Sequence, residues 1–256
     1  MIKKGFFLRV ILFMVIIPAL SFAQSSSEKD AQSLLSAFMS YTDLRISSVQ
    51  QNLEILASTN EAKSGKWENM KAMLSVYQQS DEGLIVWYVR PDGTYYTVDK
   101  GLMDVKLSDR SYFSDLMADR KIIGDIVVSR STGQRSAVIA VPMKEGGKVV
   151  GAIGASLFLD KLSDQISYIL SLRTDIAFFA LAPNGLTTLH IKTDRHFLDP
   201  RELGSETLKK ATNEMLSGTS GEVTYDFDNA TKKAIYRTSP LTQWKFAITF
   251  SAVPQK

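Results

Sequence analysis

The amino-acid sequence predicts an α+β fold in which a long N-terminal helix precedes two tandem modules, each a five-stranded antiparallel sheet packed by helices. Apolar residues recur at steps of three and four over residues 30–58, which is the spacing of one helix face. Short β-type runs separated by turn residues follow, and their layout occurs twice. Two Pro-Asx-Gly turns, at residues 91–93 and 183–185, lie 183 − 91 = 92 residues apart, which indicates an internal duplication.

The N-terminus has the three parts of a secretory signal peptide. They are a basic start, an apolar stretch and small residues ahead of a cleavage point (Lys3, Lys4 and Arg9; residues 6–22; Ser21 and Ala23). The uninterrupted apolar core is shorter than the roughly 20 residues that a transmembrane helix needs. The sequence therefore predicts a signal peptide over residues 1–23, cleavage between Ala23 and Gln24, and a periplasmic protein. An uncleaved anchor in the inner membrane is the alternative.

Composition excludes several classes of function. The 256 residues contain no Cys, which rules out thiol catalysis and thiolate metal sites. The formal net charge of +3 includes the three basic residues of the signal, so the mature chain is near neutral. A near-neutral chain lacks the basic surface that nucleic-acid binding needs, and we expect no nucleic-acid partner.

The first part of the mature chain is expected to be helical. Residues 24–29 are Ser-rich and are predicted to form a flexible tether. Residues 30–82 then hold two helices, a long one over 30–58 and a shorter one over 67–79. The long helix has one apolar face, made of Ala31, Leu35, Phe38, Thr42, Ile46, Val49, Leu53 and Leu56.

The two modules follow, and their elements are predicted in the same order. In the first module, residues 83–160, we expect strands at 83–90, 94–98, 124–130, 136–144 and 148–159, with a helix from Ser108 to residue 118 after the second strand. A connecting helix covers residues 161–174. In the second module, residues 175–252, we expect strands at 175–182, 186–191, 221–227, 233–238 and 244–251, with a helix at 205–216 that Gly218 ends.

Several motifs in the first module resemble those of the double Cache family, also called PDC-type sensor domains, of bacterial chemoreceptors and sensor kinases. They are W-Y-V-R-P-D-G-T-Y-Y at 87–96, L-S-D-R-S-Y-F at 107–113, G-D-I-V-V-S-R-S-T-G at 124–133, A-V-P-M-K at 140–144 and G-A-I-G-A-S-L at 151–157. The resemblance covers about residues 30–252. It implies two PAS-like modules on a shared helix, an extracytoplasmic location, and small-molecule binding in the first, membrane-distal module.

The chain departs from the family pattern at its end. Most members continue into a second transmembrane helix and a cytoplasmic output domain, whereas this sequence ends at Lys256. The resemblance therefore implies a standalone form that passes ligand occupancy to a separate membrane sensor kinase or chemoreceptor. A homodimer through the long N-terminal helix is a further expectation.

The resemblance also implies ligand-binding residues. Amino-acid-binding members hold the ligand carboxylate with an Arg-x-Trp-Tyr motif, and the matching stretch here contains Arg110, Tyr112 and Phe113. Arginine suits a carboxylate because its planar guanidinium gives two parallel charged hydrogen bonds. Tyr112 replaces the Trp as a donor, whereas Phe113 lacks the hydroxyl of the family's Tyr.

The same members hold the ligand ammonium with acidic residues, and this chain has Ser129 and Ser156 at the matching positions. A cation taken out of water needs an anionic or aromatic partner, and two serines supply no charge. We therefore expect a small organic acid without an amine, with Ser129, Ser156 and Arg135 completing its hydrogen bonds.

Each of these residues has an alternative role. Arg110 could form a surface ion pair with Asp109 or Asp115, Tyr112 and Phe113 could belong to the core, and the serines could be ordinary strand residues. The whole chain could then be an interaction or scaffold protein with a non-functional pocket.

No enzyme, metal or cofactor motif accompanies these residues. The sequence has no nucleophile elbow, phosphate loop or dinucleotide fingerprint. His190 and His196 are six residues apart, which matches no helical metal spacing. We expect no enzymatic activity, no metal and no cofactor.

Overall fold

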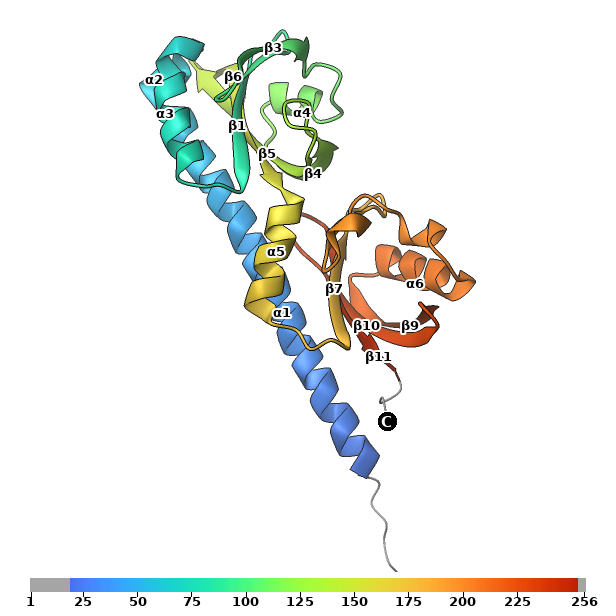
Figure 1. Ribbon diagram of the computed structural model, residues 1–256. Helices are drawn as coiled ribbons and strands as arrows, with labels where there is room; N and C mark the ends of the chain where they lie inside the picture. The colour runs from blue at the N-terminus through green and yellow to red at the C-terminus, as the bar shows by residue number, and fades with distance from the viewer. Residues whose placement is uncertain (1–18, 253–256) are drawn as a thin grey trace, which may run out of the picture.

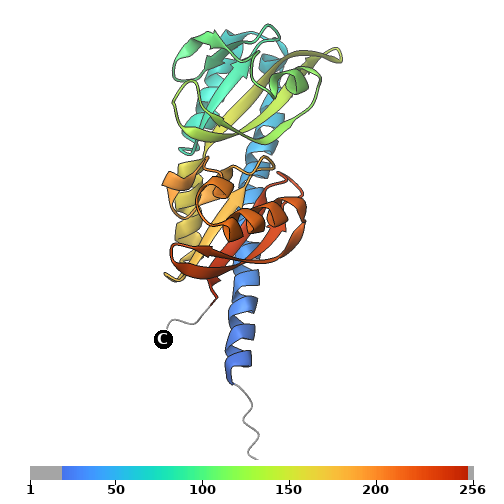
Figure 2. The same cartoon turned by 90° about the vertical axis from the view of Figure 1, so that its right-hand side faces the viewer.

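The fold consists of two sheet modules stacked end to end along one long helix (Figures 1 and 2). The structure is a computed structural model that describes residues 19–252. We call residues 83–160 the distal module and residues 175–252 the proximal module. The predicted signal peptide lies mainly outside the described residues, and cleavage between Ala23 and Gln24 stays a prediction.

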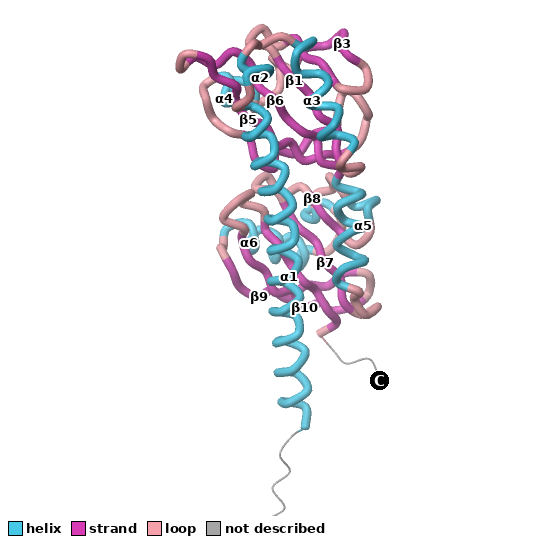
Figure 3. Tube along the Cα trace, turned by 90° about the vertical axis from the view of Figure 1, so that its left-hand side faces the viewer, coloured by secondary structure: helices cyan, strands magenta, loops and turns pink. Residues whose placement is uncertain are grey.

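Helix α1, Ala19–Ala57, runs along one side of both modules (Figure 3). At a rise of 1.5 Å per residue its 39 residues span about 58 Å. The predicted face is confirmed, because seven of its eight positions are buried and Leu56 is partly buried against the same core. The tether prediction differs from the structure, since residues 24–29 continue the helix. No helix within residues 19–252 is long and apolar enough to cross a membrane.

Two shorter helices, α2 (Asn60–Lys63) and α3 (Trp67–Gln79), lead from α1 into the distal sheet. Helix α3 has the bounds that its apolar spacing predicts, and it buries Trp67, Met70 and Leu74. Trp67 stacks on Tyr96 of the sheet, with ring centroids 5.2 Å apart. The same side of the distal sheet is therefore covered by α1 and α3.

The distal sheet has six antiparallel strands rather than the five predicted, in the order β3-β2-β1-β6-β5-β4. Their bounds are β1 Leu84–Val89, β2 Thr94–Thr97, β3 Gly101–Lys106, β4 Ile122–Val128, β5 Arg135–Glu145 and β6 Lys148–Phe158. The additional strand, β3, is an edge strand whose residues are exposed or only partly buried, so no apolar alternation marks it in the sequence.

The helix predicted from Ser108 is shorter than expected and begins later, as α4, Phe113–Met117. Residues 107–112 instead form successive turns, with Arg110 N–H bonded to Leu107 O at 3.0 Å. Leu107 N–H is itself bonded to Gly93 O at 2.9 Å, and this contact fixes the segment against the β1–β2 turn. Gly93 has φ +83°, and a Cβ there would lie 2.7 Å from the Cβ of Ser108, so the close approach requires glycine.

The proximal module repeats this topology with five strands in the order β8-β7-β11-β10-β9. Helix α5, Leu159–Leu170, connects the modules and lies beside α1. The remaining elements are β7 Ile176–Leu181, β8 Thr187–His190, the 3-10 turns η1 Thr193–Arg195 and η2 Pro200–Glu202, α6 Glu206–Ser217, β9 Ser220–Phe227, β10 Ala230–Thr238 and β11 Lys245–Ser251. Gly218 does follow α6, but with φ −88° rather than a left-handed conformation.

The two Pro-Asx-Gly turns confirm the duplication at the level of hydrogen bonds. Gly93 N–H bonds Arg90 O and Gly185 N–H bonds Ala182 O, both at 2.9 Å. In each turn the Asx side chain also accepts the N–H two residues on, at 3.0 Å for Asp92 and 3.1 Å for Asn184. The repeat therefore includes the turn chemistry and not only the strand order.

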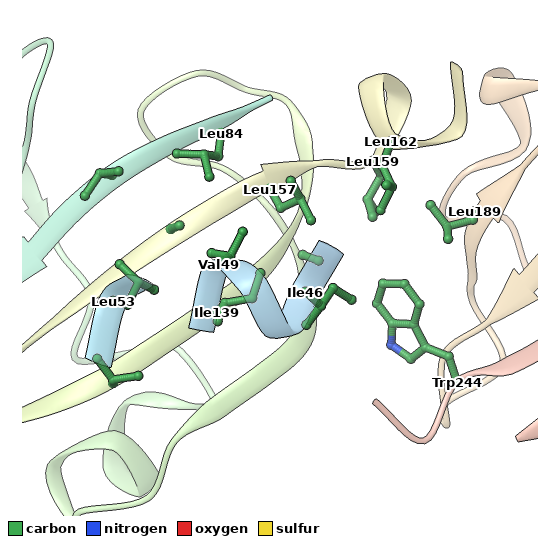
Figure 4. Packing of buried hydrophobic residues seen from close by; sticks show 14 of the residues in the cluster. Ile46, Val49, Leu53, Leu84, Ile139, Leu157, Leu159, Leu162, Leu189 and Trp244 are labelled. Atoms are coloured by element: carbon green, nitrogen blue, oxygen red, sulfur yellow. The ribbon is translucent and has the colours of Figure 1, made fainter. Parts of the chain in front are cut away.

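The main hydrophobic core is continuous from one module to the other (Figure 4). Leucines from α5 and side chains of α1 meet Trp244 of the proximal module at the junction. The Trp244 indole is 1% exposed, and its N–H donates to Gly124 O in the distal module at 3.2 Å. The opposite face of each sheet is covered by α4 or α6 and has a separate, smaller core.

Candidate functional site

A small cavity of about 20 Å³ lies on the outward face of the distal sheet, between the sheet and the segment that joins β3 to α4. It is lined by side chains from β1, β2, β4 and β6, from that segment and from the turn after β4: Trp87, Tyr95, Leu107, Arg110, Tyr112, Val127, Ser129, Arg130, Ser131 and Ser156. A volume of this size holds about one water molecule, so a larger ligand requires the covering segment to move.

Arg110 places a buried donor in this cavity. One terminal nitrogen donates to Val128 O at 2.9 Å, which fixes the side chain against strand β4. Its Nε is buried and has no hydrogen-bond partner within residues 19–252. A buried guanidinium nitrogen without a partner is costly, and a ligand oxygen would relieve that cost.

Two tyrosines add further polar atoms. Tyr95 is 3% exposed, and its hydroxyl is also buried without a partner among the described residues. Tyr112 is 5% exposed, and burial raises its pKa to about 12. Both hydroxyls are therefore protonated at neutral pH and available as donors.

An ion pair lies at the edge of the cavity. Arg130 donates to both carboxylate oxygens of Asp109, at 2.8 and 2.6 Å, and also to Lys106 O. The Arg130 guanidinium holds the pKa of Asp109 below its ordinary value. Arg130 lines both the cavity and an outer hollow that contains Asp109, so this pair lies between the two.

Ser129 and Ser156 both lie in the cavity, each 6% exposed. Ser156 Oγ accepts the indole N–H of Trp87 at 3.3 Å, and Ser129 Oγ lies 3.2 Å from Ser131 Oγ. Trp87 reaches this position because Gly154 opposes it, since a Cβ on Gly154 would lie 2.3 Å from the indole ring. Glycine within this strand therefore permits the close packing of Trp87.

The charged side chains that line the cavity are two arginines. Arg130 is paired with Asp109 outside the cavity, whereas Arg110 has no carboxylate partner there, and no carboxylate lines the cavity among the described residues. Such a lining favours a ligand with negative charge and offers no anionic partner for an ammonium group.

Two of the predicted site residues do not line the cavity. Phe113 is the first residue of α4 and packs against the outward core of the distal module. Arg135 is the first residue of β5, at the end of the sheet nearest the proximal module, where it bonds His196 O at 3.2 Å and Asp160 at 3.4 Å. Neither lines the distal cavity.

Sequence reasoning missed several lining residues, above all Arg130. Its neighbour Ser129 was found by matching to the family's binding positions, whereas Arg130 lies in the same quoted motif, at 124–133, but was given no role. Trp87 and Tyr95 were quoted only as part of the motif at 87–96. Strand pairing places Trp87 and Tyr95 on the cavity face and Tyr96 on the face toward α3.

The two histidines form no metal site. His196 is 2% exposed and bonds Asp160 at 2.7 Å and Ser163 at 3.0 Å, whereas His190 accepts the N–H of Lys192 at 2.8 Å. Within residues 19–252, no three His, Cys, Asp or Glu side chains gather closely enough to hold a metal ion.

The chain is similar to solved bacterial sensory domains over nearly its whole length. The sensory domain of the Campylobacter jejuni chemoreceptor Tlp3, solved with isoleucine bound, has a TM-score of 0.70 and 16% identity, over 93% of this chain and 98% of that one. The extracellular domain of rpHK1S-Z16, which is named a histidine kinase, has a TM-score of 0.74 and 18% identity, over 90% and 96%. The ligand-binding domain of Pseudomonas fluorescens CtaA, solved with L-isoleucine, has a TM-score of 0.68 and 14% identity, over 91% and 94%.

A sequence relative agrees with these structures. The methyl-accepting chemotaxis protein McpB of Bacillus subtilis is 27% identical over 187 residues, which are 71% of this chain. The match spans 26% of that receptor's length. No family model matches the chain.

The chain therefore has the fold of these chemoreceptor and histidine kinase sensory domains. The double Cache fold predicted from the sequence is confirmed.

Proposed function

We propose that this chain is an exported sensory domain that binds a small carboxylate lacking an amine in the cavity of its distal module. The observation that supports this most is the pair of buried, unpartnered polar atoms, Arg110 Nε and Tyr95 OH, in one cavity. An anionic oxygen that entered the cavity would give both atoms a partner.

The ligand class follows from charge. Two arginines and no carboxylate line the cavity, so an amino acid would bring an ammonium group with no anion to meet it. The Tlp3 and CtaA domains were solved with isoleucine, and in this proposal the present chain differs from them in ligand class.

A route for the ligand into the cavity is part of the proposal. The ligand carboxylate would compete with Asp109 for Arg130, and loss of this ion pair would remove one of the contacts between the β3–α4 segment and the turn after β4, while the Arg110 bond to Val128 O holds the segment in place. The Asp109 side chain is exposed, so it exchanges one partner for water at little cost.

The signalling role is the finer part of the proposal. A periplasmic domain of this fold would report ligand occupancy to a membrane sensor kinase or chemoreceptor through α1, the helix that both modules share. An uncleaved, membrane-tethered form is the alternative, and N-terminal sequencing of the exported protein separates the two. A mature N-terminus at Gln24 supports cleavage.

Calorimetric titration tests the ligand class. We expect the purified domain to bind at least one acid from a panel of acetate, propionate, pyruvate, lactate and succinate, and to bind alanine, valine and isoleucine more weakly or not at all. Binding of an amino acid with no binding of any acid would contradict the proposal. No binding from either set would favour the scaffold alternative.

A further inference from the structure

A second and larger cavity, of about 200 Å³, lies in the proximal module between the outward face of its sheet and the segments around α6. Its floor is formed by buried side chains from the sheet and from α6, among them Phe179, Leu208, Met215 and Tyr225. Ligand pockets usually measure about 300–1,000 Å³, so this cavity suits a small ligand.

The proximal cavity occupies the same place in its module as the distal cavity. Trp87 and Tyr95 line the distal cavity, and the residues 92 positions later, Phe179 (179 − 87 = 92) and Thr187 (187 − 95 = 92), line the proximal one. Strand pairing shows that Ser156 and Thr249 also occupy matching positions in the two modules. Ser156 lies two residues after Gly154, the partner of Trp87, and Thr249 lies two residues after Ala247, the partner of Phe179.

Strands β4 and β9 complete the comparison. Pairing across each sheet from Ser156 and Thr249 leads to Asp125 on β4 and Val223 on β9. The next two positions on the same face are Val127 and Ser129 in the distal module and Tyr225 and Phe227 in the proximal module, and all four line their cavities. The duplicated fold therefore produces a cavity at the same place twice, with different side chains.

The floor of the proximal cavity is apolar but includes hydroxyl groups. The Tyr225 hydroxyl donates to Thr249 Oγ1 at 3.1 Å. Thr212 of α6 is fully buried, and its hydroxyl has no partner within the described part of the chain. A ligand oxygen would supply the partner that Thr212 lacks, because buried hydroxyl groups are normally hydrogen-bonded.

The mouth of the cavity has an excess of positive charge. Lys192, Arg195 and Lys232 line it, against Asp175 and Asp228. Asp175 already accepts two hydrogen bonds from Arg173, at 2.8 and 3.1 Å, whereas Asp228 lies 3.6 Å from Arg195. Arg195 is held over the ring of Phe227, 4.7 Å from its centroid, which keeps the guanidinium beside the apolar lining.

We infer that the proximal module has a ligand site of its own, which takes a small monocarboxylate with an aliphatic body. The aliphatic body lies on the apolar floor, and the carboxylate pairs with Arg195 at the mouth. The inference does not rest on the function proposed for the distal cavity, because its residues belong to another module.

Methionine methyl groups make the site testable by NMR. Met215 lines the proximal cavity, whereas Met103 and Met117 pack against the core that surrounds the distal cavity. Titration of [13C-methyl]methionine-labelled protein with isovalerate should shift the Met215 resonance and leave Met103 and Met117 in place. Isovaleramide, which has the same shape and no charge, should leave Met215 in place as well.

Two variants test the contacts. Arg195→Gln should weaken isovalerate binding roughly tenfold or more, because a charge-assisted hydrogen bond is lost. Thr212→Val keeps the side-chain volume and should weaken binding without lowering the melting temperature. Arg120→Gln removes an exposed arginine of the distal module, and it should bind as the unmodified chain does.

Three results would overturn the inference. They are a Met215 resonance unmoved by isovalerate, hexanoate and benzoate alike, an equal shift with isovaleramide, or an affinity unchanged in both Arg195→Gln and Thr212→Val. A shift confined to Met103 or Met117 would also overturn it, and would leave the distal proposal standing.

Discussion

At the residue scale, both cavities contain buried polar atoms that lack a hydrogen-bond partner within residues 19–252. They are Arg110 Nε and Tyr95 OH in the distal module and Thr212 Oγ1 in the proximal module. Tyr77 OH and Thr188 Oγ1 are also buried without a partner there, but they line neither cavity. Proteins usually pair buried polar groups, so an unpartnered atom that also lines a cavity favours a partner from outside the chain.

His190 gives a prediction about stability and pH. Burial lowers its pKa to about 3, below the value of about 6.5 that it has in an unfolded chain. The stability linked to this depressed pKa is present above pH 6.5 and is lost as the pH falls toward 3. Between pH 7 and pH 5 the loss is about 2 kcal/mol, because only the unfolded state takes up the proton.

Denaturant unfolding at pH 7, 6 and 5 measures this loss. His190→Asn keeps an acceptor for Lys192 N–H and should show a weaker pH dependence by about 2 kcal/mol. Burial also lowers the pKa of His196, so His196 likewise reduces stability as the pH falls. Burial raises the pKa of Asp43, so Asp43 has the opposite effect on stability. Equal pH dependence in the variant and the unmodified chain would contradict the assignment to His190.

At the element scale, α1 is predicted to stabilise the molecule through one face. Phe38 is fully buried and packs on Phe178 and Phe246, with ring centroids 4.9 and 4.8 Å away. Phe38→Ala should lower the free energy of unfolding by about 3–5 kcal/mol. Leu44 lies on the same helix but is 69% exposed, so Leu44→Ala should cost less than about 0.5 kcal/mol. Urea denaturation of both variants checks the difference, and similar losses would contradict the assigned face.

Elements with a strong apolar period could be predicted from the sequence, and α3 even has the predicted bounds. Strand β3 could not, because its residues are exposed or only partly buried and give no apolar alternation, and its place depends on pairing with β2. The turns at 107–112 replaced a predicted helix because contacts with Gly93, distant along the sequence from them, override a local cap signal.

The residues of the candidate site also fall into those that the sequence predicts and those that it does not. Arg110, Tyr112, Ser129 and Ser156 could be found because the motif fixes their spacing. Arg130 depends on an ion pair with Asp109 across 21 residues, and Arg135 was misplaced because its strand begins at the module junction. The positions of Arg130 and Arg135 depend on contacts between residues far apart in the chain, which a single sequence does not reveal.

At the scale of the whole molecule, the modules share one core and a polar network. Arg135 and Asp160 contact His196 of the proximal module, and Trp244 donates to Gly124 O across the junction. A shared core predicts that both modules unfold together. Tryptophan fluorescence and far-UV circular dichroism should therefore give coincident urea transitions, and two separated transitions would contradict a shared core.

The central claim is that the distal cavity binds a carboxylate through Arg110. Calorimetric titration of the acid that binds the unmodified chain, repeated with Arg110→Gln and with Arg120→Gln, tests it most directly. The account predicts that Arg110→Gln weakens binding by roughly tenfold or more, through loss of a charged hydrogen bond, and that Arg120→Gln binds normally. Unchanged affinity in a correctly folded Arg110→Gln variant would contradict the claim.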